Sequence, residues 1–237
     1  MSADANDEAS FGVGKHVYKS LKWGTIRTDS STLDKFKTLK ELGYDGVELD
    51  SPEGVDKREA LQASRTTGLP IEGIVNSTHW RIRHSDPDPA VRAQALKNMR
   101  TALRDAKYVS ADSVLLVPGK VTDPKTENHA QVWERSIAGI RKLLPLAAEL
   151  KIKILIENIG NGFCYDPKQL AQYIDEINSR WVCGPAFTQG GWRVYIKDSD
   201  FVAPGPSSTW VLLDEREDTI NDGYFAVRME GYQTVPL

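Results

Sequence analysis

The sequence is poor in cysteine and has no long apolar run. Its 237 residues include two cysteines, too few for a disulfide scaffold or a thiolate zinc site. No apolar stretch approaches the roughly 20 residues that span a bilayer, so we expect no membrane association. The opening MSADANDEAS lacks the positive start and apolar stretch of a secretory signal. We therefore expect a cytoplasmic protein in a reducing compartment.

A basic surplus and several common catalytic motifs are also missing. Lys and Arg total 30 against 33 Asp and Glu, which gives a formal net charge of -3. A protein that neutralises a phosphate backbone is usually basic, so we expect no nucleic-acid partner. The sequence contains no GxGxxG that opens a helix after a strand, no GxxxxGK[ST], no HExxH and no GxSxG. Dinucleotide, P-loop, zincin and serine-hydrolase chemistry therefore find no support.

What is present is a repeated alternation of short β-branched runs with longer amphipathic runs. With 40% apolar and 27% charged residues, the composition is that of a folded globule. The alternation between 21 and 182 predicts five βα units and a parallel sheet. The expected strands are 21–26, 46–49, 71–75, 113–117 and 152–156. The expected helices begin near 31, 57, 88, 127 and 166, and Pro145 interrupts the fourth.

The predicted fold class is thus α/β, a partial (β/α) TIM-type barrel of about five βα units with a short β-rich C-terminal tail. We expect residues 1–18 to be a flexible N-terminus and 19–182 to be the barrel portion. The glycine-rich break CGPAFTQGG then predicts a boundary near Cys183. Within the tail, 183–237, Asp222 and Gly223 form a tight-turn sequence between two strand-like runs.

Polar residues that follow the apolar runs are the candidate site, because ligands bind beyond the carboxyl ends of parallel strands. Glu157 closes the run IKILI, where an ionised carboxylate needs a cation or a donor. A bound metal ion and a salt bridge to Lys or Arg are equally good explanations. Asn158 follows directly, and either steadies a substrate hydroxyl or caps the loop.

Four further candidates come from the earlier strands and loops. His79 offers an imidazole for metal binding or for proton transfer near neutral pH, and Trp80 offers a face for sugar stacking. The alternative for His79 is a loop histidine hydrogen-bonded to backbone. Glu48 is a second candidate carboxylate, with a salt bridge as its alternative, and Lys120 after Pro-Gly offers a cation for an anion.

Four segments together resemble the sugar-phosphate isomerase/epimerase branch of the xylose-isomerase-like TIM barrels. They are FKTLKELGYDGVELDSP, GIVNSTHW with DPDPAVRAQALKNMR, SVLLVPGKV, and LPLAAELKIKILIENIGNGF. The resemblance implies a proton shift between adjacent carbons of a ketose or aldose through an enediolate, assisted by a divalent metal (Mn, Mg, Co or Zn). It implies that Glu157 is a metal ligand and an acid/base group, and that Glu48 and His79 lie at the mouth that receives a sugar or sugar phosphate.

The chain departs from this family pattern after SRWV, where CGPAF follows instead of the expected sixth strand. The other metal ligands of the family come from the sixth to eighth strands, so Glu157 alone would hold a metal weakly. The alternative hypothesis is a non-catalytic sugar- or partner-binding α/β protein or an inactive fusion product. An abasic-site endonuclease of the same superfold ranks last, because only four histidines are present and the net charge is acidic.

Two expectations concern the ends of the barrel portion. The tail segment from Trp192 onward resembles the C-terminal region of prepilin-type pseudopilins, which suggests a fusion with an unrelated protein. Five βα units without closure leave the first and fifth strands as open edges. We expect these edges either to pair with strands of the tail or to join two chains in a homo-oligomer.

Overall fold

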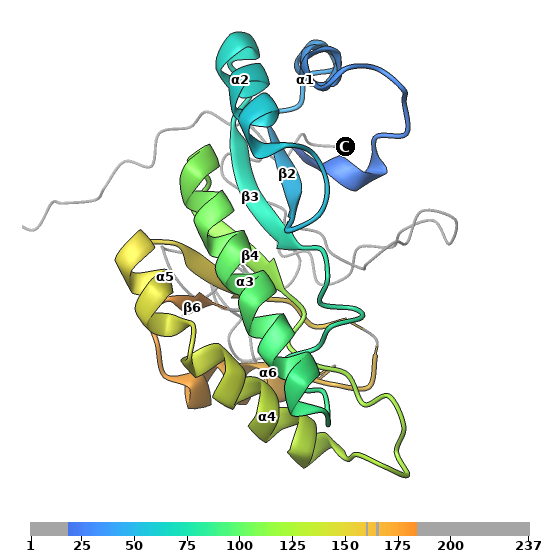
Figure 1. Cartoon of the computed structure of the whole chain (residues 1–237), viewed down its shortest axis with the longest axis vertical. Coiled ribbons are helices and arrows are strands. Elements are labelled where there is room, and N and C mark those ends of the chain that lie inside the picture. Colours follow the sequence, from blue (N-terminus) through green and yellow to red (C-terminus); the bar gives the residue numbers. More distant parts are fainter. Residues whose placement is uncertain (1–18, 160, 165, 184–237) are drawn as a thin grey trace, which may run out of the picture.

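The computed structural model describes residues 19–159, 161–164 and 166–183, which form one parallel sheet with helices between its strands (Figure 1). The six strands are hydrogen-bonded in chain order, from β1 to β6. Their bounds are β1 (Ser20–Lys22), β2 (Gly46–Ser51), β3 (Ile71–Asn76), β4 (Ser113–Leu116), β5 (Lys153–Ile156) and β6 (Val182–Cys183). Every neighbouring pair is parallel, which confirms the predicted α/β class.

Five of the six helices of the described residues, all except α5, begin after a residue whose side chain caps the first turn. The six are α1 (Thr32–Glu41), α2 (Lys57–Thr67), α3 (Pro89–Val109), α4 (His129–Arg141), α5 (Leu144–Leu150) and α6 (Pro167–Ile177). Asp88 accepts a hydrogen bond from Ala90 N in the first turn of α3, and Asp166 accepts one from Lys168 N in α6. Both α3 and α6 also have proline in the first turn, where the missing N–H costs nothing.

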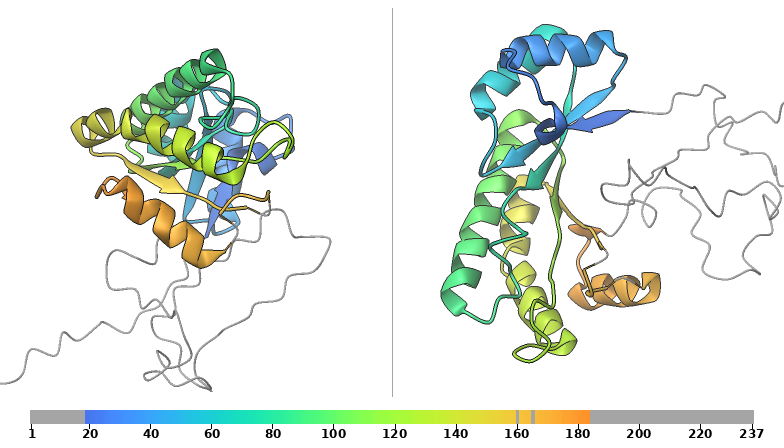
Figure 2. Two further views of the ribbon diagram at one scale, coloured as in Figure 1. Left: turned by 90° about the horizontal axis from the view of Figure 1, so that it is seen from below. Right: turned by 90° about the vertical axis from the view of Figure 1, so that its right-hand side faces the viewer.

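The core lies between the sheet and the helices that run along one of its sides (Figure 2). The long helix α3 packs along β3 and β4. Val47 and Leu49 of β2 are fully buried in this layer, and the Ser51 hydroxyl donates to Asp105 of α3 over 2.6 Å. Because side chains alternate along a strand, the residues between them point to the other side of the sheet.

The boundaries of the first and last predicted units are corrected by the structure. The strand expected over 21–26 is only β1, and the chain then turns into a short 3-10 helix over Trp23–Thr25. A Cβ on Gly24 would lie 3.1 Å from an Asp50 carboxylate oxygen, so the chain comes close to β2 at this turn. The helix predicted to begin near 166, whose amphipathic pattern extends to Trp181, ends at Ile177. The freed residues lead into β6, whose Val182 and Cys183 pair with Ile154 and Leu155 of β5.

Two of the three expected domains fall wholly or almost wholly outside this description. The proposed N-terminal segment, 1–18, and the tail lie outside the described residues, except for Cys183 in β6. The tight turn at Asp222 and Gly223 therefore stays a prediction, as does the domain division itself. Among the helices of the described residues, none combines the length and apolarity needed to cross a membrane.

A pair of leucine substitutions tests the assigned core. Leu103 of α3 is completely buried, whereas Leu42 at the end of α1 is 64% exposed. We expect Leu103→Ala to lower the free energy of unfolding by about 2–5 kcal/mol because it leaves a cavity. Leu42→Ala should change it by about 0.5 kcal/mol or less. Urea unfolding followed by circular dichroism measures both, and equal effects would contradict the core described here.

Candidate functional site

Three carboxylates share the face of the sheet that is turned away from the helices. Glu48 and Asp50 alternate with the buried Val47 and Leu49 of β2, so they occupy the opposite face. Glu157 continues the same alternation one residue after β5, where its N–H donates to the carbonyl oxygen of Leu116 over 3.1 Å. In a barrel this face is the interior. Glu48 and Asp50 are held by β2, and Glu157 is held by the hydrogen bond of its N–H directly after β5.

Glu48 lies deeper than the sequence predicted. The second strand was expected to end at Leu49, which would have placed Glu48 near its end, but β2 runs on to Ser51. Glu48 therefore lies in mid-strand opposite Gly73 of β3. A Cβ on Gly73 would lie 3.1 Å from a carboxylate oxygen of Glu48, so the glycine leaves room for this side chain.

Asp50 is a candidate site residue that sequence reasoning did not select. It is two residues closer to the carboxyl edge of β2 than Glu48, on the same face. Partial burial raises the pKa of its carboxyl group, while Lys22 of β1, with its Nζ 4.0 Å from an Asp50 oxygen, opposes that rise. The sequence signal for Asp50 is the alternation Glu-Leu-Asp, which puts Asp50 on the same face as Glu48. That alternation applies to Asp50 only if the strand extends past Leu49.

His79 is held in a defined orientation just beyond β3. Asn76, the last residue of β3, accepts hydrogen bonds from both the N–H and the hydroxyl of Thr78, and Asn98 of α3 donates to the same hydroxyl. This buried network fixes the turn that precedes His79. The Nδ1 atom of His79 accepts a hydrogen bond from the N–H of Val117 over 3.2 Å. For this nitrogen the structure therefore shows the hydrogen bond to backbone that was the alternative to a functional role.

The protonation state of His79 follows from this geometry. Burial, with smaller effects from Lys22 and His84, lowers the pKa of His79 to about 3. A neutral imidazole that accepts at Nδ1 carries its proton at Nε2. That Nε2 atom is buried and has no hydrogen-bond partner in the described part of the chain. His79 is thus a neutral hydrogen-bond donor at the carboxyl end of the sheet.

The remaining predicted residues lie in the loops beyond the strands. Trp80 is 51% exposed and meets the His79 ring edge-on, with ring centroids 4.7 Å apart. Lys120 is exposed, and its backbone carbonyl accepts a hydrogen bond from Arg83 over 2.7 Å. Asn158 is half-buried directly after Glu157. The loop after β5 is joined to the loop after β4 by Asn161 and not by Asn158: the Asn161 side chain donates to the carbonyl of Gly119 over 2.9 Å.

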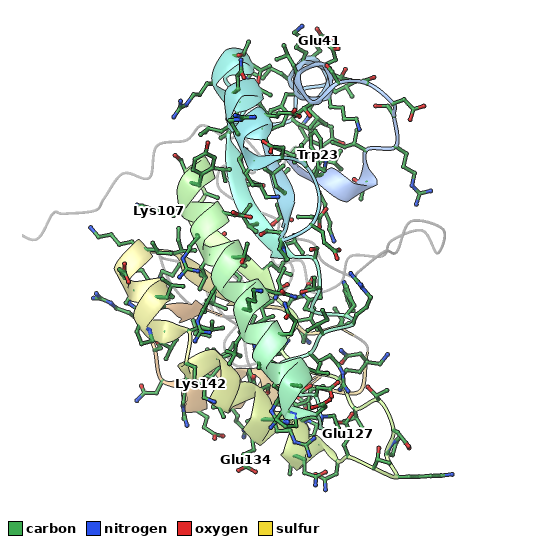
Figure 3. The ribbon with its side chains drawn as sticks, viewed as in Figure 1. Trp23, Glu41, Lys107, Glu127, Glu134 and Lys142 are labelled. Atoms are coloured by element: carbon green, nitrogen blue, oxygen red, sulfur yellow. The ribbon has the colours of Figure 1, made fainter. Side chains whose placement is uncertain are left out.

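A buried carboxylate ties the loops after β3 and β4 to α4. The Glu127 side chain is 1% exposed, and its two oxygens lie 3.1 Å from Arg83 and 3.4 Å from Arg135 (Figure 3). The helix predicted to begin near Glu127 starts at His129, which leaves this residue in the preceding loop. Two cations around one carboxylate compensate the cost of burying its charge. The loops that carry His79 and Lys120 are therefore fixed relative to each other.

The described residues do not form a divalent-metal site by themselves. No group of three or more His, Cys, Asp or Glu side chains within 19–159, 161–164 and 166–183 is arranged to hold a metal ion. His79 adds no ligand in this arrangement, because Nδ1 accepts from Val117 and Nε2 carries the proton. Glu157 supplies one carboxylate, whereas catalytic metal sites usually combine three or more protein ligands.

The parallel sheet and the strand-end carboxylate agree with the comparison to protein families. A family model described as the xylose isomerase-like TIM barrel matches residues 36–184, more than half of the chain. The protein therefore belongs to the xylose isomerase-like TIM barrel family. The predicted partial TIM-type barrel is confirmed, and the sheet from β1 to β6 is the described portion of it.

Individual relatives are similar at low sequence identity. L-ribulose-5-phosphate 3-epimerase UlaE of Escherichia coli (strain SMS-3-5 / SECEC) is 24% identical over 160 residues, covering 63% of this chain and 56% of the relative. The structure of 3-keto-D-glucoside 4-epimerase YcjR from E. coli has a TM-score of 0.61 at 18% identity, covering 71% of this chain and 67% of that one. An AP endonuclease, family 2, from Brucella melitensis has a TM-score of 0.60 at 16% identity, with coverages of 74% and 72%.

These similarities establish the fold but cover only part of the relatives. At such identities the two solved structures establish the fold alone. The chain spans about 56% of the length of the curated epimerase that it matches. The resemblance of the tail to pseudopilins is not borne out by the comparisons, and the tail lies outside the described residues apart from Cys183.

The buried neutral state of His79 predicts a loss of stability in mild acid. An unfolded histidine titrates near 6.5, whereas folded His79 titrates near 3, so acid protonates the unfolded chain first. The stability contributed by this depressed pKa is complete above pH 6.5 and is lost as the pH falls toward 3. Between pH 7 and pH 5 we expect it to account for about 2 kcal/mol of lost unfolding free energy.

Replacing the imidazole isolates this contribution. In His79→Gln, the decrease in unfolding free energy between pH 7 and pH 5 should be smaller than in the unchanged protein by about that amount. Urea titrations at the two pH values measure it. An unchanged pH dependence in the variant would show that His79 is accessible to protons in the folded state.

Proposed function

We propose that this protein acts on a sugar or sugar phosphate through an enediolate, as an isomerase that moves a proton between adjacent carbons or as an epimerase that inverts the carbon next to the carbonyl. The observation that carries the proposal is Glu157, a carboxylate at the carboxyl end of β5 on the inner face of a chain of this family. The relatives named above include two sugar epimerases, which supports a sugar as the substrate class.

The described residues suggest a division of roles. Glu157 would take the proton from the carbon next to the substrate carbonyl to form an enediolate. In an isomerase the proton then returns to the neighbouring carbon while the hydroxyl proton passes from one oxygen to the other; in an epimerase a second acid returns a proton to the same carbon from the opposite face. The Nε2–H of His79 would donate a hydrogen bond to the oxygen that gains negative charge, and a neutral donor does so without losing its proton. Trp80, half exposed beside it, offers an apolar ring face for the sugar.

The substrate contacts of Glu48, Asn158 and Lys120 belong to the same proposal. Glu48 and Asp50 lie on the inner face, where they can accept hydrogen bonds from sugar hydroxyls. Lys120 is exposed in the loop after β4 and is available to the phosphate of a phosphorylated sugar. A cytoplasmic location is consistent with a metabolic substrate and stays a prediction.

Metal dependence would require ligands in addition to Glu157. Glu157 is the one predicted ligand among the described residues, so any further ligands must come from residues outside the described ranges or from a second chain. A second chain could approach along β1 or β6, the two end strands of the described sheet.

The alternative function is non-catalytic binding of a sugar or a partner. A fusion product without activity belongs to the same alternative. The observation that favours it is the lack of a metal-ligand group in the part of the chain that the structure describes. Under this alternative the inner face would still bind a sugar, but Glu157 would not exchange protons with it.

Deuterium exchange separates these two functions. The full chain is incubated in D2O with L-ribulose 5-phosphate, the substrate in the name of the curated relative, and proton NMR follows deuterium entering next to the carbonyl. We expect Glu157→Gln to slow this exchange at least about 100-fold, because an amide cannot accept the proton.

The matched control is Glu149→Gln, which changes an exposed glutamate of α5, the helix that precedes the amino end of β5 and not its carboxyl end. It should leave the exchange rate unchanged. Equal rates in the Glu157→Gln variant and the unchanged protein would refute the proposed role of Glu157. Absence of exchange in the unchanged protein would favour non-catalytic binding.

Retained metal tests the remaining element of the proposal. The full chain, Glu157→Gln and Glu149→Gln are dialysed against Mn²⁺ and then against buffer, and bound metal is measured by elemental analysis. If further ligands complete the site, the unchanged protein and Glu149→Gln retain Mn²⁺ and Glu157→Gln loses it. The molecular mass in solution, measured on the same samples, distinguishes ligands from a second chain from ligands within one chain. Equal, negligible retention in all three proteins would rule out metal dependence through Glu157.

A further inference from the structure

A pocket lies on the outer side of the barrel portion, between α3 and α4. Its volume is about 390 Å³, and its polar lining comes from both helices and from the loop after β3. Figure 3 shows Glu134 and Lys142, two of its lining residues, along α4. None of the carboxylates of the inner face lines it, so it is separate from the candidate site at the strand ends.

His84 is the unusual residue of this pocket. The residue is only 2% exposed, yet neither ring nitrogen has a hydrogen-bond partner among the described residues. Burial also lowers the pKa of His84 to about 4, so the ring is neutral at physiological pH. Buried polar groups in native proteins are almost always paired. A neutral imidazole with both nitrogens unsatisfied in a pocket lining therefore points to a ligand.

Gly139 shows that α4 is shaped around this ring. A Cβ at position 139 would lie 3.1 Å from Nδ1 of His84, closer than an ordinary contact. Glycine inside a helix is unfavourable relative to alanine, and here it leaves room for the imidazole. The histidine and the glycine thus form a built feature of the pocket, on two elements far apart in the sequence.

The charge of the lining favours an anion. Three cations, Arg92, Arg135 and Lys142, line the pocket together with one carboxylate, Glu134. The guanidinium of Arg92 donates to the backbone carbonyls of Asp86 and Pro87, over 2.6 and 2.8 Å, and has no carboxylate partner within the described ranges.

The other two cations differ in how far they are already neutralised. Arg135 lies 3.4 Å from Glu127, which it shares with Arg83. Lys142 is exposed and makes no ion pair with any described residue. At least two positive charges of the lining are therefore not balanced by an ion pair, against the single carboxylate of Glu134.

We propose that this pocket binds a small oxyanion, with the phosphate group as the chemical class. Arg92 and Lys142 supply the charge, and His84 supplies a neutral N–H donor in a water-poor setting. Phosphate offers several acceptor oxygens to donors that approach from α3, α4 and the loop after β3. The proposal does not depend on the function of Glu157, because the two sites share no residue.

Imidazole NMR on the full chain tests this site directly. Histidine side chains are labelled with 15N, and the signals of His84 are assigned by their loss in His84→Gln. Inorganic phosphate is titrated at constant ionic strength, with chloride as the balancing salt. We expect a saturable shift of the His84 signals, while those of His79 stay unchanged. Ribose 5-phosphate in a parallel titration distinguishes a phosphorylated metabolite from free phosphate as the better ligand.

Two lysine variants give the control. Lys142→Gln changes an exposed side chain of the lining and should weaken phosphate binding about tenfold, as expected for the loss of one charged contact. Lys107→Gln changes an exposed lysine of α3 outside the lining and should leave binding unchanged (Figure 3). A His84 shift that is not saturable, that chloride reproduces, or that both variants weaken equally would overturn the proposal. Neither result bears on the deuterium exchange assigned to Glu157.

Discussion

The arrangement of the candidate site depends on the register of the parallel strands. Helices cover one face of the sheet, and the alternation of side chains in β2 and after β5 turns Glu48, Asp50 and Glu157 to the other face. A shift of one residue would place these carboxylates among the buried side chains that pack on α3, at a high desolvation cost. The same apolar packing that stabilises the sheet therefore selects which polar groups reach the inner face.

A second constraint acts on the loops. The buried Glu127 carboxylate brings Arg83, from the loop after β3, together with Arg135 of α4. Removing any one of the three would leave charge buried without full compensation. Arg83 also holds the backbone of Lys120, and Arg135 lines the pocket between α3 and α4. One ion cluster thus contributes both to the geometry of the strand-end loops and to the wall of the outer pocket.

The fold alone does not decide the chemistry. Sugar epimerases and an AP endonuclease of family 2 all superimpose on this chain at TM-scores near 0.6. The residues at the strand ends carry the functional argument instead. A single strand-end glutamate with a neutral histidine donor is compatible with proton transfer, whereas the described residues offer no cluster of metal-ligating side chains.

The sequence determined the elements, because their signals are local. Asp88 and Asp166 with their following prolines mark helix starts, and Gly68 marks the end of α2 with a φ of 67°. Glu157, the residue that follows β5, was equally readable from its position. Only the tertiary structure decided that β2 reaches Ser51, that Val182 begins a sixth strand, that His79 accepts from Val117, and that His84 lies against Gly139. Each of these depends on a contact between residues far apart in the chain, where the energy comes from pairing and burial rather than from local propensity.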